Sequence, residues 1–73
     1  MKTYLTLYLY SEGARPSEVT KKLERMGFVA LQGPYDFMYD WRRDATVDEV
    51  VEFGDKVRVL LKELRVYFKM ETI

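Results

Sequence analysis

The chain has 73 residues and carries 12 basic and 12 acidic side chains, so its formal net charge is zero. At this length only about 60 to 65% of the unfolded surface can be buried, which predicts one core and a single domain over residues 1–73. Cys and His are absent; this excludes disulfide scaffolds and thiolate zinc sites, removes the commonest general base, and leads us to expect no catalytic residue, metal or cofactor.

The first predicted elements are a strand over residues 2–10 and a helix over residues 15–26. Side chains of two kinds alternate along the strand: Leu5, Leu7 and Leu9 against Tyr4, Thr6, Tyr8 and Tyr10. This period of two is typical of a half-buried strand. In the helix, Pro16 suits the first turn and the apolar residues recur every three or four positions. Gly27 fits the left-handed conformation that ends such a helix.

Residues 28–31 and 35–42 are predicted to form a hairpin of two strands. Gly33 and Pro34 supply the tight connection between them. The second of these strands again alternates, with aromatic residues on one side and mostly polar residues on the other: Tyr35, Phe37, Tyr39 and Trp41 against Asp36, Met38, Asp40 and Arg42. The aromatic side is therefore expected to face the helices.

The longest predicted helix begins at Thr46 and is followed by a strand over residues 64–73. Thr46 and Glu49 have the spacing of a capping box. In this motif the Thr hydroxyl accepts from a backbone N–H of the first turn, and the Glu carboxylate accepts from the backbone N–H of the cap residue. Gly54 lies on the apolar side of the helix. Since a mid-helix Gly costs about 1 kcal/mol relative to Ala, it predicts close approach to a neighbouring strand.

The predicted element order is βαββαβ. Right-handed crossovers applied to its two βαβ halves give a four-stranded antiparallel sheet in the order 4-1-3-2, with both helices on one face. We therefore predict the α+β class and the ferredoxin-like arrangement.

The uncovered face of this sheet is the predicted interaction surface. It should be basic along the last strand, aromatic in the middle and acidic along residues 35–42. The predicted interface residues are Tyr4, Thr6, Tyr8, Tyr10, Met38, Asp40, Arg65, Tyr67 and Lys69. Such a surface is self-complementary under a two-fold axis, which favours a homodimer. The alternative is that cross-strand tyrosine pairs simply stabilise a hydrated sheet.

RNA binding is a further alternative. Residues 33–39 have the aromatic spacing of the RNA-recognition-motif signature, which requires Tyr35 and Phe37 to point outward and stack on bases. That orientation would bury Asp36 without an obvious cation. The zero net charge also argues against nucleic-acid binding.

Residues 33–38, together with the capped helix and the closing strand, resemble the effector-binding (RAM) domain of the Lrp/AsnC family. The resemblance implies a dimer made by packing sheet faces, further assembly of dimers, and amino-acid effectors bound between subunits. By position it carries ligand binding to Gly33, Tyr35 and Asp36, where the carboxylate could bind an α-ammonium group. A helix-turn-helix regulator is the partner that the resemblance implies for contact with DNA.

We therefore expect a non-enzymatic regulatory or assembly module that homo-oligomerises and binds an amino acid or similar metabolite. A purely structural oligomerisation protein is the alternative. The longest run of low charge is far shorter than the roughly 20 residues that span a bilayer, so a cytoplasmic location without membrane contact is expected. The charged fraction of 33% and the absence of Asn lean towards a thermophilic source.

Overall fold

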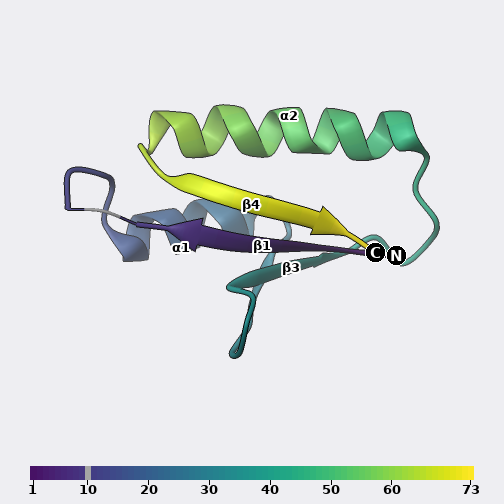
Figure 1. Cartoon of the computed structure of the whole chain (residues 1–73), viewed down its shortest axis with the longest axis horizontal. Coiled ribbons are helices and arrows are strands. Elements are labelled where there is room, and N and C mark those ends of the chain that lie inside the picture. The colour runs from purple at the N-terminus through teal and green to yellow at the C-terminus, as the bar shows by residue number, and fades with distance from the viewer. Residues whose placement is uncertain (10) are drawn as a thin grey trace.

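The computed structural model describes residues 1–9 and 11–73 of the chain (Figure 1). In these residues six elements follow one another: β1 (Lys2–Tyr8), α1 (Pro16–Arg25), β2 (Val29–Ala30), β3 (Phe37–Asp40), α2 (Val47–Glu63) and β4 (Tyr67–Thr72). The strands form one antiparallel sheet in the order β2-β3-β1-β4. The predicted α+β class, with four antiparallel strands and two helices, is thus confirmed for the described residues.

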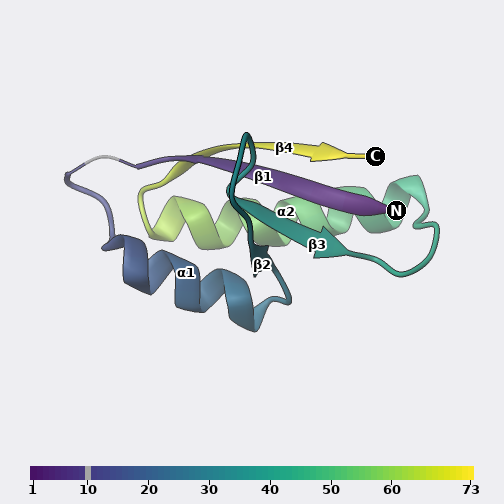
Figure 2. The same ribbon diagram turned by 90° about the horizontal axis from the view of Figure 1, so that it is seen from below.

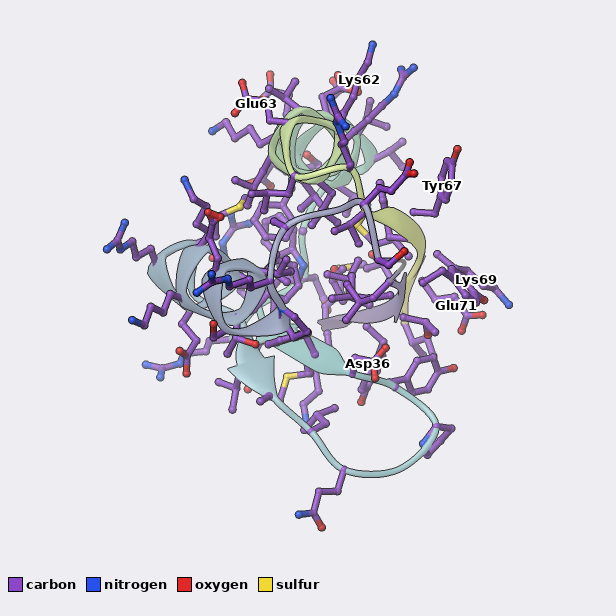
Figure 3. All side chains as sticks on the ribbon, turned by 90° about the vertical axis from the view of Figure 1, so that its left-hand side faces the viewer. Asp36, Lys62, Glu63, Tyr67, Lys69 and Glu71 are labelled. Atoms are coloured by element: carbon purple, nitrogen blue, oxygen red, sulfur yellow. The ribbon has the colours of Figure 1, made fainter. Side chains whose placement is uncertain are left out.

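Both helices lie on the same side of the sheet, α1 beside β2 and α2 beside β4 (Figures 2 and 3). Apolar side chains from the helices, the strands and the turns that follow the helices fill the space between the layers: Leu5, Val19, Leu23, Phe28, Phe37, Val57, Leu61, Leu64 and Val66. We call the uncovered side of the sheet the open face. It carries Lys2, Tyr4, Thr6, Tyr8, Val29, Met38, Asp40, Tyr67, Lys69 and Glu71.

Helix α1 begins one residue after and ends one residue before the predicted range of 15–26. Pro16 occupies the first turn, and Val19 and Leu23 are the buried positions of the helix. After the helix, Gly27 has φ 102°, a conformation that residues with a Cβ atom rarely adopt. The N–H of Phe28 donates to the carbonyl of Leu23 and that of Gly27 to Glu24. These two bonds form the Schellman ending, in which a left-handed residue reverses the chain.

Helix α2 has the predicted capping box. The Thr46 hydroxyl accepts from the N–H of Glu49, and the Glu49 carboxylate accepts from the N–H of Thr46. Arg43 also donates to Glu49; this bond, followed by the one from Thr46, lowers the pKa of Glu49 to about 2. A Cβ atom at Gly54 would lie 3.0 Å from the Sδ-bound methyl carbon of Met70. The predicted close approach of this glycine to a strand is therefore confirmed.

The segment between α2 and β4 differs from the prediction, because a turn without glycine stands where the strand was expected to begin. Arg65 takes the left-handed conformation with φ 57°. Its N–H donates to Lys62, and the N–H of Val66 donates to Leu61, which is the same pair of bonds that ends α1. The predicted strand over residues 64–73 is consequently wrong at its start, and β4 begins only at Tyr67.

The other strands are also shorter than predicted. Strand β1 ends at Tyr8, and Tyr10 lies outside the described residues. Strand β2 has two residues, and β3 covers four residues in place of the expected 35–42. At the start of β3 the N–H of Asp36 donates to Leu5 O, although Leu5 has Phe37 as its register partner. This irregularity, which resembles a bulge, ends the ladder before Tyr35.

A polar contact lies within the covered side of the sheet. Thr3 is fully buried, and its Oγ1 lies 2.8 Å from Thr72 Oγ1 and accepts from Trp41 Nε1 at 2.8 Å. Among the described residues, no buried side-chain nitrogen or oxygen lacks a hydrogen-bond partner. Thr3 therefore satisfies the indole N–H of the half-buried Trp41, and Thr72 bonds to Thr3 in turn.

Candidate functional site

The open face is built from rows of residues that lie side by side across the strands. The longest row crosses all four strands, in the order Val29, Met38, Tyr4 and Glu71. The next rows along β1 and β4 pair Thr6 with Lys69 and Tyr8 with Tyr67. Tyr4, Thr6 and Met38 are half-buried, whereas Tyr8 is 53% and Tyr67 is 71% exposed. The structure thus brings most of the predicted interface residues onto one continuous surface.

The charges on the open face are more mixed than the predicted basic, aromatic and acidic bands. Lys69 on β4 lies 3.3 Å from Glu71 on the same strand, and Lys2 is the register partner of Asp40. Figure 3 shows Lys69 and Glu71 projecting together from the side of the sheet opposite the helices. Arg65 lies in the turn before β4, so it does not belong to this surface.

Tyr35 is part of the open face, contrary to the expectation that it packs beneath the helices with Phe37. Its ring lies against that of Tyr4, with 4.8 Å between ring centroids, and its hydroxyl donates to Glu71 Oε2 at 2.8 Å. This bond raises the pKa of Tyr35 from its usual value, with smaller contributions from desolvation and from the Glu71 charge. The same bond, aided by Lys69, lowers the pKa of Glu71. The bond stabilises the neutral phenol and the charged carboxylate.

Phe37, in contrast, is only 6% exposed and belongs to the core. The two aromatic positions of the RNA-recognition signature therefore lie on opposite sides of the sheet, and they do not form the outward stacking pair that this reading requires.

Asp36 holds the end of the hairpin against β1. Its Oδ2 accepts from the N–H of Leu7 at 2.7 Å, its N–H donates to Leu5 and its carbonyl accepts from Leu31. The carboxylate occupies the place that a backbone carbonyl would take if β3 continued. One of its two oxygens is thus committed to the fold.

A shallow hollow of about 190 Å³ lies beside Asp36. It is lined by Leu7, Leu9, Pro16, Val19, Thr20, Asp36 and Phe37. Gly33 has φ 110°, and no atom outside its chain neighbours comes within 4 Å of where its Cβ would be. In Figures 1 and 2 the connection between β2 and β3 projects from the sheet. The three predicted ligand residues therefore have different surroundings: Gly33 lies in this connection, Tyr35 on the open face and Asp36 beside the hollow.

Two groups of residues were missed by sequence reasoning. Glu71 anchors Tyr35, and its parity with Tyr67 and Lys69 was a signal that could have added it to the open face. The second group is a basic groove between α2 and β4, with a volume of about 440 Å³; it is lined by Arg58, Lys62, Arg65, Val66, Tyr67 and Phe68. Its cations come from a helix and a turn, so strand alternation could not reveal it.

Residues 1–9 and 11–73 contain no group of three or more carboxylate, His or Cys residues arranged to hold a metal ion. None of the helices in this part of the chain is both long and apolar enough to cross a membrane. No family model matches the chain, and no match was found among curated proteins or solved structures.

Proposed function

We propose that this chain is a small non-enzymatic assembly module of ferredoxin-like topology that pairs with a second copy through its open face. The topology is supported by the βαββαβ element order and by the strand order β2-β3-β1-β4, which read from the opposite edge is 4-1-3-2. The two helices on one side leave the other side of the sheet available for a partner (Figure 3).

The observation that carries the pairing proposal is the aromatic row on the uncovered side. Tyr8 and Tyr67 are register partners and are both more than half exposed. They adjoin the half-buried row that contains Tyr4 and Met38. Tyrosine and methionine are enriched at protein interfaces, and contiguous exposed apolar surface usually marks a contact.

A single substitution tests this surface. Tyr8→Glu places a carboxylate in the middle of the proposed contact and is expected to lower the molar mass of the assembly at least by half, as measured by light scattering. Val59→Glu is the matched control, because Val59 has a similar exposure of 59% but lies on α2, away from the open face. A Tyr8→Glu chain with the mass of the unchanged assembly would contradict the proposal.

Amino-acid binding is the second proposal, and the hollow beside Asp36 supports it. Apolar side chains form most of its lining, and among the described residues Asp36 Oδ1 has no protein partner. An α-ammonium group could bind that oxygen while an apolar side chain fills the hollow.

Thermal denaturation with each of the twenty amino acids tests ligand binding, since a ligand at 100 times its Kd adds about 2.7 kcal/mol to stability. A shift that persists in Asp36→Asn would exclude this site, and no shift with any amino acid would favour the purely structural alternative.

A further inference from the structure

The outer edge of β4 has backbone groups that are left unpaired by the sheet. Lys2 and Ile73 exchange two N–H···O bonds of 2.9 Å. Because antiparallel pairs alternate between bonded and non-bonded, the same pattern bonds Glu71, Lys69 and Tyr67 to β1 and turns the backbone of the intervening residues outward. These residues are Phe68, Met70 and Thr72. Among the described residues, no other segment forms backbone hydrogen bonds with this edge.

The two edges of the sheet differ in their capacity to bind another strand. Strand β2 has two residues, whereas β4 has six and contains no Pro. Natural proteins usually shorten, interrupt or cover such an edge, since an open one is a template for another strand. The edge of β4 is therefore the one that can receive a partner strand.

The flank of α2 beside this edge is exposed and partly apolar. Val47, Val51, Gly54, Arg58 and Lys62 follow one another at spacings of four, three, four and four, so they form one stripe along the helix. Gly54 lies against Met70, and the two cations line the groove beside Phe68. Val47 is 79% and Val51 is 57% exposed. A partner strand that adds to β4 would bring its own helix alongside this stripe.

Of the two-fold registers centred on Lys69, Met70 or Glu71, the charges on β4 favour one for a second copy of the chain. If two β4 strands pair about a two-fold axis at Lys69, two lysines face each other, and an axis at Glu71 brings two glutamates together. An axis at Met70 places each Lys69 opposite Glu71 of the other copy, and it also keeps the outward backbone groups in bonded pairs. We propose that a second copy docks along β4 in this register and extends the sheet across the two-fold axis.

The antiparallel helices of such a dimer also have complementary charge. The first half of α2 carries Asp48 and Asp55, whereas Arg58 and Lys62 lie in its second half. Among the described residues these two cations form no ion pair within 4 Å. Rotation about the axis brings the acidic half of one helix toward the basic half of the other and covers the exposed valines.

This contact is separate from the one proposed for the open face, and it is tested in the Tyr8→Glu background, where open-face pairing is removed. Hydrogen exchange is followed by NMR at low and at millimolar concentration. The amides of Phe68, Met70 and Thr72 should exchange at least about tenfold more slowly at the higher concentration, and those of Lys69 and Glu71 should be protected at both. Edge amides that stay unprotected at millimolar concentration would overturn the proposal.

The register is tested with cysteines, which the chain otherwise lacks. In the proposed register, residue 69 lies opposite residue 71 in a non-bonded pair, where Cα atoms about 4.5 Å apart permit a disulfide. Mild oxidation should therefore cross-link a mixture of the Lys69→Cys and Glu71→Cys chains, and neither chain alone. Equal cross-linking of either single variant, or none in the mixture, would contradict the register centred on Met70.

Discussion

The two faces of the sheet are both aromatic, but different forces hold their rings. On the covered side Tyr39, Trp41, Phe28 and Phe53 form a cluster with ring centroids 4.5 to 5.8 Å apart. On the open face Tyr35 is held against Tyr4 by a hydrogen bond to Glu71 that water can replace. The comparison shows that alternation placed the ring of Phe37, which packing holds, but misplaced that of Tyr35, which a polar bond holds.

The largest difference between the faces is expected at neighbouring residues of β1. Leu5 is fully buried and Thr6 points to the open face. Leu5→Ala should lower the free energy of unfolding by about 2 to 5 kcal/mol, because it leaves a cavity in the core. Thr6→Ala should change it by less than about 1 kcal/mol. Urea denaturation at low protein concentration measures both, and equal effects would contradict the assignment of the covered side.

A smaller effect is expected for the polar contact on the covered side. Thr3→Val keeps the shape of the side chain but removes the acceptor for Trp41 Nε1 and the partner of Thr72. The unsatisfied groups should cost about 1 to 3 kcal/mol. Thr6→Val on the open face is the control. An unchanged unfolding midpoint in Thr3→Val would show that these hydrogen bonds contribute nothing to stability.

The smallest effect is expected on the open face, and it is best measured by titrating the Glu71 carboxyl. Tyr35→Phe removes the largest cause of the lowered pKa of Glu71, so that pKa should rise toward its usual 4.5, with Lys69 still opposing the rise. NMR titration of the Glu71 carboxyl measures the shift, and Tyr8→Phe should leave it unchanged. A Glu71 pKa that does not move in Tyr35→Phe would show that the hydrogen bond is absent in solution.

The sign of the pH dependence follows from the same bond. Glu71 has a lowered pKa in the folded chain, so its contribution to stability is complete above the unfolded value and is lost as the pH falls through the folded one. Tyr35 has a raised pKa, so its contribution is complete below its usual value of 10.0 and is lost as the pH rises beyond it.

Periodicity and capping residues were sufficient to predict most of the fold. Thr46 and Glu49 marked the start of α2 correctly, and Gly27 marked the end of α1, because each residue type has a distinct local function there. The end of α2 could not be predicted in this way. Arg65 adopts the conformation usually taken by glycine, and the tertiary packing of Val66 and Leu61 makes up for its unfavourable backbone.

The candidate site was harder to predict, because it depends on one irregular residue. Strict alternation through residues 35–42 assigned Tyr35 to the same side as Phe37. The extra bond from Asp36 to Leu5 breaks that alternation and turns Tyr35 onto Tyr4. Long-range polar contacts of this kind, including that of Glu71, are not encoded in any local pattern.

The Asp36 carboxylate also limits how a ligand could act at the hairpin. It accepts the N–H of Leu7, beyond the point where β3 can provide a carbonyl. A molecule that bound Asp36 Oδ2 would leave the N–H of Leu7 to water and would loosen the end of the pairing between β1 and β3. Binding there would loosen the end of β1, next to the exposed Tyr8, so a metabolite would weaken self-association through the open face without contacting the second subunit.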